Sequence, residues 1–141
     1  MSSQRGAAAE RIAAEYLSAH GLQILTQNYR CRLGEIDLIA RDADTLCFVE
    51  VRYRRTETYG GPAATVDSRK QQRVVRAATH FLFTQGGDGR FPSRFDVVSI
   101  TGELREGQAG SRRGRSDGAS ATALTIQWFK NAFELSGWGA G

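Results

Sequence analysis

Two acidic residues stand inside apolar runs of the chain, where charged side chains are uncommon. Asp37 occurs in the run 34–39 (GEIDLI), and Glu50 occurs in the run 48–52 (FVEVR). If a hairpin turn joins the two runs, antiparallel pairing places Asp37 opposite Glu50, with Cβ atoms about 4.5–5.5 Å apart. Two partly buried carboxylates at that separation repel one another, and a hard divalent cation between them would relieve the repulsion.

The same strands also admit a purely structural interpretation. In the register that pairs Asp37 with Glu50, Glu35 lies opposite Arg52, and a neighbouring arginine could neutralise Asp37. A ladder of salt bridges of this kind is slightly favoured over a metal site when spacing is the only criterion. Both interpretations therefore stay open at this point.

Positive charge is concentrated in one segment of the chain. The 141 residues carry a net charge of +4, whereas residues 52–76 hold seven cations against Glu57 and Asp67, which gives +5. A local excess of arginine suits an anionic polymer such as nucleic acid, because guanidinium groups bind phosphates in a bidentate manner. On charge alone, a solvated helix face explains the segment equally well. The candidate DNA-binding residues are Arg54, Arg55, Arg69, Arg73 and Arg76.

The elements that must position these side chains begin with a helix and three strands. Apolar residues recur with helical spacing over residues 5–20, and Gly21 supplies a stop. Strand-like runs follow at 22–31, 34–41 and 45–53, and residues 42–44 (DAD) are typical of a hairpin turn between the last two.

A second helix has the clearest pattern in the chain. The run 68–71 (SRKQ) is typical of a capping box, which predicts that the helix begins at Ser68. The helix should bury one side against the sheet and expose the other. The apolar side holds Val74, Ala77, Ala78, Phe81 and Leu82, and the opposite side holds Arg69, Arg73, Arg76 and His80.

The remainder of the chain completes a single α/β domain over residues 1–141. Residues 95–100 (FDVVSI) alternate like a strand, and the run 124–129 (LTIQWF) resumes an apolar pattern. Between them, residues 102–122 hold five glycines and seven charges, which predicts a disordered loop within the domain. The order α-β-β-β-α-β-β implies one mixed sheet flanked by two helices.

Several classes of protein are excluded by composition. No apolar run is long enough to span a bilayer, and the first residues lack the apolar core of a secretory signal, so a cytoplasmic location is predicted. Cys31 and Cys47 lack the spacing of zinc ligands and lie in strand-like surroundings, which favours buried, reduced thiols.

The motifs and their order resemble those of the bacterial YraN family, within the restriction-endonuclease-like PD-(D/E)xK superfamily, which is similar to archaeal Holliday-junction resolvases. The resemblance covers residues 5–100 and the last strand. The matching pieces are Glu10, 27–30 (QNYR), 34–39 (GEIDLI), 48–51 (FVEV), 70–74 (KQQRV), 94–98 (RFDVV) and 131–133 (NAF).

The resemblance implies a restriction-endonuclease-like fold and a metal-dependent endonuclease that hydrolyses DNA, with branched or structured DNA as candidate substrates. It implies Mg²⁺, with Mn²⁺ as an alternative, held by Glu10, Asp37 and Glu50. Arg52 stands where the superfamily usually has a catalytic lysine, and Lys70 is a candidate to take over that role. By analogy with resolvases, a homodimer would provide two active sites.

Two further hypotheses follow from the same residues. Arg52 cannot give up a proton as lysine can, so the fold could serve as a non-catalytic nucleic-acid-binding module with Arg52 held by Glu35 or Glu50. A structural protein whose arginine face binds an acidic protein would explain the +5 segment but not the pairing of Asp37 with Glu50. We rank the nuclease first and the binding module second.

Overall fold

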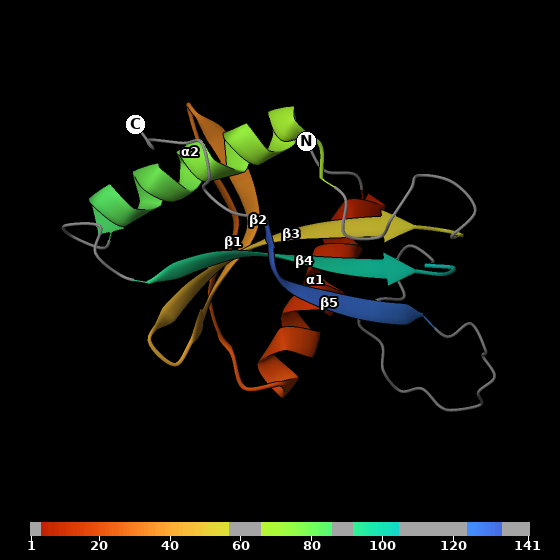
Figure 1. Cartoon of the computed structure of the whole chain (residues 1–141). Helices are drawn as coiled ribbons and strands as arrows, with labels where there is room; N and C mark the ends of the chain where they lie inside the picture. Colours follow the sequence, from red (N-terminus) through yellow and green to blue (C-terminus); the bar gives the residue numbers. More distant parts are fainter. Residues whose placement is uncertain (1–3, 57–65, 86–91, 105–123, 134–141) are drawn as a thin grey trace.

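The computed structural model has one five-stranded sheet and two helices (Figure 1). It describes residues 4–56, 66–85, 92–104 and 124–133. The order α-β-β-β-α-β-β confirms the predicted α/β architecture. The elements are α1 (Gln4–Ala19), β1 (Gln23–Cys31), β2 (Gly34–Asp42), β3 (Thr45–Arg54), α2 (Ser68–Gln85), β4 (Ser93–Thr101) and β5 (Thr125–Phe133).

The strands lie in the sheet in the same order as in the sequence, β1-β2-β3-β4-β5. Neighbouring strands pair antiparallel except for β3 and β4, which are parallel. A parallel pair needs a long crossover connection, and α2 lies in that connection. The mixed sheet predicted from the sequence is therefore confirmed.

The two helices cover opposite faces of the sheet, so the protein has two hydrophobic cores (Figure 1). Alternation along the strands divides the side chains between them. Leu38 and Val49 pack with α1, whereas Ile39 and Phe48 pack with α2. The same alternation places Glu50 on the α2 side of β3, beside the helix that carries Lys70.

One end of each helix is capped by specific hydrogen bonds. Gly21 at φ 96° follows α1, and the N–H of Leu22 bonds back to the carbonyl of Leu17, as in a Schellman motif. The helix α2 begins at Ser68 as predicted, but the capping residue is Asp67. Its Oδ1 accepts the N–H of Lys70 at 2.9 Å, which orients the first turn of α2.

Glycine at position 34 lets the β1–β2 turn lie directly against α2. A Cβ atom at Gly34 would stand 2.2 Å from the backbone carbonyl oxygen of Arg73. Any side chain there would force the turn and the helix apart. The first residue of the GEIDLI run therefore serves packing.

Three predictions need correction or a limit. His80 does not share the solvent-facing side of α2 with the arginines, because it is half-buried and its Nδ1 lies 2.6 Å from the Tyr29 hydroxyl. Cys47 is buried as predicted, but Cys31 is only half-buried. Of the predicted loop 102–122, residues 105–122 lie outside the described ranges, while Leu104 is buried in the core beside α1.

Over their described residues, neither α1 nor α2 combines the length and the hydropathy that crossing a bilayer requires.

Candidate active site

The predicted pairing of β2 with β3 is confirmed from Asp42–Thr45 to Leu38–Val49, and the recorded register ends there. Asp37 is the next residue of β2, and its Oδ2 accepts the backbone N–H of Val51 at 2.8 Å. The carboxylate thus serves as the acceptor for a backbone group on the neighbouring strand. The end of the β2–β3 ladder is where the site begins.

Glu50 lies on β3 next to the end of the β2–β3 ladder and is 7% exposed. Its Oε2 is 3.1 Å from Nζ of Lys70, which comes from the first turn of α2. Its Oε1 is buried and has no hydrogen-bond partner among the described residues. One oxygen of Glu50 therefore contacts the lysine ammonium, whereas Oε1 has no donor among the described residues, and the carboxyl group lies within hydrogen-bonding reach of Asp37.

Glu10 joins the acidic pair from the opposite side of the sheet. It lies on α1, and its carboxyl group is within hydrogen-bonding reach of Asp37. Burial, followed by the charge of Asp37, raises the pKa of Glu10 from 4.5 to about 7. Glu35 adds to this effect, which places a fourth acidic residue near the group. We call Glu10, Asp37 and Glu50 the acid cluster.

Burial and mutual repulsion make the acid cluster retain protons at neutral pH. Burial and the charge of Asp37 raise the pKa of Glu50 from 4.5 to about 8, and burial raises the pKa of Asp37 as well. Burial alone would lower the pKa of Lys70, but the carboxylates of Glu50 and Asp37 outweigh it and the pKa lies above its usual value. One lysine cannot neutralise three carboxylates, so the cluster remains partly protonated.

The donor set of the cluster suits a hard divalent cation in part. Carboxylate oxygens are the ligands that Mg²⁺ and Mn²⁺ prefer, and the orphaned Oε1 of Glu50 supplies an available one. Within the described ranges, however, no three His, Cys, Asp or Glu side chains are already grouped around a common centre. The fit is therefore that of one or two carboxylates with water, a mode typical of Mg²⁺.

Arg52 lines a small cavity beside Glu50. The cavity has a volume of about 190 Å³ and is also lined by Val66, Asp67 and Lys70. The predicted pair of Arg52 with Glu35 lies beyond the end of the β2–β3 register, and Glu35 forms an ion pair with Arg30 across β1 and β2, at 3.8 Å between Arg30 Nε and Glu35 Oε1. Two cations, Arg52 and Lys70, therefore flank the cavity at Glu50.

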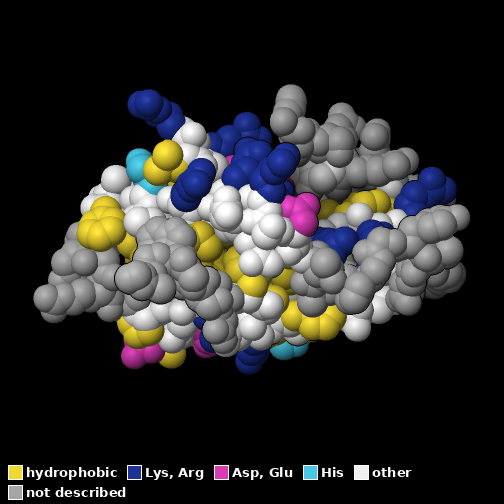
Figure 2. All heavy atoms as spheres, turned by 45° about the horizontal axis from the view of Figure 1, so that its top comes forward, with side chains coloured by type: hydrophobic (Ala, Val, Ile, Leu, Met, Phe, Trp, Pro, Cys, Tyr) yellow, Lys and Arg dark blue, Asp and Glu magenta, His cyan; other side chains and the backbone are white. Residues whose placement is uncertain are grey.

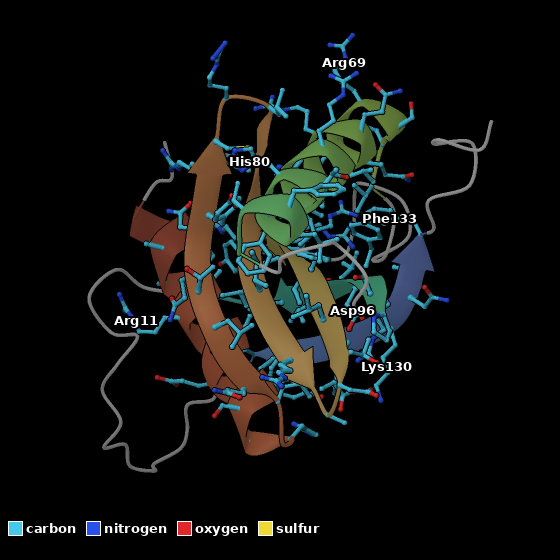
Figure 3. All side chains as sticks on the ribbon, turned by 90° about the vertical axis from the view of Figure 1, so that its left-hand side faces the viewer. Arg11, Arg69, His80, Asp96, Lys130 and Phe133 are labelled. Atoms are coloured by element: carbon cyan, nitrogen blue, oxygen red, sulfur yellow. The ribbon has the colours of Figure 1, made fainter. Side chains whose placement is uncertain are left out.

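The predicted DNA-binding arginines occupy two separate places. Arg69, Arg73 and Arg76 are exposed on α2, and Figure 2 shows Lys and Arg side chains gathered over this part of the surface. Figure 3 shows the Arg69 side chain extending outward from the first turn of α2, far from Arg11 on α1. Arg54 is half-buried at the end of β3, and Arg55 follows it, with Nη2 3.8 Å from Glu103 Oε2.

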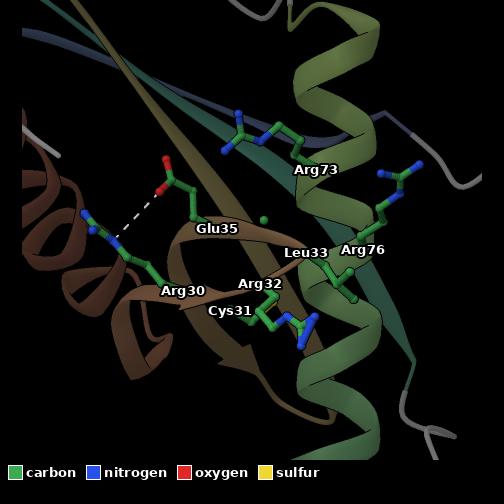
Figure 4. Close-up of a pocket in the computed structure, with 8 residues that line it drawn as sticks. Arg30, Cys31, Arg32, Leu33, Glu35, Arg73 and Arg76 are labelled. Carbon is green, nitrogen blue, oxygen red and sulfur yellow. Dashed lines mark ion pairs between the residues drawn. The ribbon is translucent and has the colours of Figure 1, made fainter.

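Two arginines at the β1–β2 turn were missed by the sequence analysis. Arg30 and Arg32 line one pocket together with Arg73 and Arg76 (Figure 4). The charge count over residues 52–76 could not find them, because they come from a different part of the chain. The sequence could have pointed to Arg30, because this residue ends the run 27–30, which is one of the pieces that resemble the family.

Two other matching pieces, 94–98 and 131–133, build a buried network away from the acid cluster. Asp96 is fully buried, and its carboxylate accepts the Nε–H of Arg94 at 3.0 Å, the indole N–H of Trp128 at 3.0 Å and the backbone N–H of Asn131 at 2.9 Å. Arg94 also reaches Asp42 at 3.1 Å. This network holds β5 and the β2–β3 turn to β4, so its role is structural.

Comparison with known sequences agrees with the motif order. Residues 9–100 match the sequence model of the uncharacterised protein family UPF0102. A UPF0102 protein of Pseudomonas putida KT2440 is 46% identical over 129 residues, which cover 92% of this chain and 91% of that protein. A UPF0102 protein of Nitrosomonas europaea is 43% identical over 132 residues (94% and 95%), and one of Legionella pneumophila is 38% identical over 134 residues (95% and 98%). The chain therefore belongs to the UPF0102 family, as the YraN-like order of its motifs predicts.

Proposed function

We propose that the protein is a metal-dependent endonuclease that hydrolyses phosphodiester bonds in DNA, with Mg²⁺ as the cofactor and Mn²⁺ as an alternative. One observation carries the proposal: Glu50 is buried beside Asp37 with an unpartnered oxygen, and Lys70 lies at its other oxygen. This combination of two acids and a lysine is what the PD-(D/E)xK resemblance implies. Burying such a group without a ligand is costly, which favours a functional role.

In this proposal the three carboxylates have distinct duties. Asp37 and Glu50 would bind the cation directly, and Glu10 would bind it through water. A divalent cation held there supplies Lewis-acid chemistry at the scissile phosphate. Because the cluster retains protons in the metal-free protein, metal binding releases protons and becomes tighter as pH rises.

Lys70 and Arg52 divide the work that one lysine does in the superfamily pattern. The Lys70 ammonium can hold or move a proton beside Glu50, whereas the guanidinium of Arg52 remains charged and stabilises negative charge developing on the phosphate. The cavity that both residues line is open to a ligand group at this point. The exposed arginines of α2 contact flanking phosphates, which positions the DNA without reading its bases.

A non-catalytic nucleic-acid-binding module is the second candidate function. The observation in its favour is that Lys70 already neutralises one oxygen of Glu50 through a 3.1 Å contact. A protein that used this ion pair only for stability would keep the fold and the arginines and lose turnover. The two candidates differ in one respect, which is bond cleavage.

A cleavage panel separates the two functions. Labelled duplex, hairpin, single-stranded and four-way-junction DNA are incubated with the full chain in Mg²⁺, in Mn²⁺ or in EDTA. The endonuclease proposal expects nicking that requires metal and is lost in Asp37→Asn, with Glu15→Gln as the exposed acidic control. Intact DNA in every lane, together with metal-independent binding of the same DNA, would overturn the endonuclease and support the binding module.

A further inference from the structure

A basic pocket of about 360 Å³ lies between the β1–β2 turn and α2 (Figure 4). Arg30 and Arg32 line it from the turn, and Arg73 and Arg76 line it from the helix. Glu35 is the acidic residue among the lining side chains, so the charges sum to +3. Four arginines line this pocket, and guanidinium groups are well suited to binding phosphate oxygens.

The two sides of this pocket are held at a fixed separation. The β1–β2 ladder continues to the pair Cys31–Gly34, which leaves a tight turn of Arg32 and Leu33. Gly34 then lies against the backbone of Arg73, so closely that a Cβ atom would not fit. The arginines of the turn and of α2 are therefore brought together by backbone packing, and a ligand does not have to assemble them.

The basic pocket adjoins the acid cluster. Glu35 lines the pocket and stands two residues before Asp37 on β2, and Arg73 stands three residues after Lys70 on α2, so both elements run from the pocket to the cluster. A nucleic-acid strand with one phosphate at Glu50 would thus have the basic pocket beside its path. From the acid cluster, such a strand would extend toward the β1–β2 turn.

The chemistry of the rim favours a strand over a free phosphate ion. Leu33 at the tip of the turn is 50% exposed, which is high for a large apolar side chain beside arginines. Inorganic phosphate offers nothing for this surface to contact, whereas the sugar and base of a nucleotide do. A nucleotide within a strand could contact Leu33 with its sugar or base and the arginines with its phosphate.

We propose that the basic pocket binds backbone phosphates of the nucleic acid next to the phosphate that lies at the acid cluster. This inference rests on nucleic acid as the partner in the proposed function. It adds the path that the strand takes beyond the acid cluster, and it adds Arg30 and Arg32 as phosphate-binding residues. It requires no metal and no cleavage, because the pocket recognises the strand by charge and shape.

The first test measures the salt dependence of binding by the full chain. A fluorescent single-stranded oligonucleotide is titrated in EDTA at several salt concentrations, so that cleavage plays no part. The variant Arg32→Gln/Arg76→Gln removes one arginine from each side of the pocket. Its slope of log K against log salt should fall by about 1.4, since each phosphate contact on a single strand contributes roughly 0.7.

A matched control removes the same charge elsewhere. Arg11 on α1 and Arg41 on β2 are exposed, and Arg11→Gln/Arg41→Gln should keep the wild-type slope. The variant Arg32→Lys/Arg76→Lys keeps the charge and should keep most of the slope, which separates loss of phosphate contacts from loss of fold. A wild-type slope in Arg32→Gln/Arg76→Gln would overturn the proposal.

The second test uses a reporter that the chain already carries. Cys31 lines the basic pocket and is half-buried, whereas Cys47 is fully buried and burial raises its pKa to about 12. Iodoacetamide should therefore modify Cys31 first, as followed by peptide mass spectrometry. The bound oligonucleotide should slow alkylation of Cys31 at least severalfold, and an unchanged rate at saturating oligonucleotide would overturn the placement of the strand.

Two comparisons distinguish this proposal from the others. A mononucleotide or inorganic phosphate that protects Cys31 at the same concentration as the oligonucleotide would overturn the strand in favour of a small phosphate ligand. Cleavage that is absent while Cys31 protection persists contradicts the endonuclease alone. Cleavage that persists without protection contradicts the pocket alone, and absence of all oligonucleotide binding contradicts both.

Discussion

The ammonium nitrogen of Lys70 lies 3.1 Å from Oε2 of Glu50, although the two residues come from α2 and β3. In the PD-(D/E)xK pattern that the motifs of this chain resemble, the lysine follows the acid by two residues on the same strand, and Arg52 would occupy that position. The cap at Asp67 orients the first turn of α2, and this turn carries Lys70 over the sheet. A lysine is thus supplied to Glu50 from a different place in the backbone.

Lys70 should be essential for turnover if it serves as the lysine of the site. Lys70→Ala is expected to lower the rate of cleavage by about 10²-fold or more, the usual contribution of a positioned acid or base. Lys130, the other lysine of the chain, lies 4.6 Å from the Trp128 ring and serves as the control. Equal rates for Lys70→Ala, Lys130→Ala and wild type would remove Lys70 from the mechanism.

Arg52→Lys should be nearly neutral for cleavage. The variant restores the usual superfamily residue and keeps the charge, but Lys70 already lies against Glu50. Initial rates with saturating Mg²⁺ should therefore stay within about threefold of wild type, which corresponds to roughly 0.6 kcal/mol in the activation barrier. A large gain in rate would mean that Arg52 limits the wild-type enzyme and that Lys70 does not replace the missing lysine.

The stability of the metal-free protein should fall as pH rises from about 5 to 8. The pKa of Glu50 is about 8 and that of Glu10 about 7 in the native state, against 4.5 ordinarily, so the native state binds more protons than the unfolded state in this range. Their stabilising protonation is complete below pH 4.5 and is lost as pH passes through the native values. The raised pKa of Lys70 acts only above pH 10.5, outside this window.

Urea denaturation in EDTA at several pH values measures this effect. Glu50→Gln should flatten the decline in the free energy of unfolding, because the amide does not titrate. Glu15 is exposed on α1, so Glu15→Gln should leave the wild-type slope unchanged. A decline of the same steepness in Glu50→Gln would assign the pH dependence to groups other than Glu50.

Most of the fold followed from periodicity. The helices, the strands and the β2–β3 register were predictable because hydrophobic spacing and turn residues are local properties. The cap of α2 was assigned to Ser68 because the capping-box pattern fits there equally well, whereas Asp67 makes the hydrogen bond. The ion pair of Glu35 with Arg30 was not predicted, because it depends on the pairing of β2 with β1, whereas the prediction considered only the pairing of β2 with β3.

The acids of the candidate site could be predicted from the sequence, but the tertiary contacts around them could not. Asp37 and Glu50 stand out as charges in apolar runs, but the proximity of Glu10 depends on how α1 packs across the sheet. Arg30 and Arg32 acquire a role only when Gly34 brings their turn against α2. Contacts between elements distant in sequence carry no periodic signal.

Gly34→Ala should destabilise the protein by about 1–3 kcal/mol or more, the range for overpacked interiors. The added methyl would collide with a backbone carbonyl of Arg73, which cannot swing aside as a side-chain end can. Chemical denaturation measures the loss. Leu33→Ala changes the same turn at an exposed position and should stay within about 0.5 kcal/mol of wild type. Equal stability of the two variants would show that the turn does not pack tightly on α2.

Asp96→Ala should cost about 3–5 kcal/mol, as expected when one partner of a buried charged network is removed. The indole of Trp128, the N–H of Asn131 and the guanidinium of Arg94 would all lose their acceptor. Asp44→Ala removes an exposed acid from the β2–β3 turn and should change the free energy of unfolding by about 0.5 kcal/mol or less. A loss at Asp96 no larger than that at Asp44 would contradict the structural role of the network.

The most direct measurement of the central claim is thermal unfolding with and without divalent cation, for wild type, Asp37→Asn and Glu50→Gln. Ca²⁺ or Mn²⁺ at millimolar concentration binds only the native site, so the wild-type Tm should rise by several degrees, as about 2.7 kcal/mol is gained at a hundredfold excess over Kd. Both variants should lose this rise, while Glu15→Gln keeps it. A rise of wild-type size in both variants, or none in wild type, would contradict a metal site at Asp37 and Glu50.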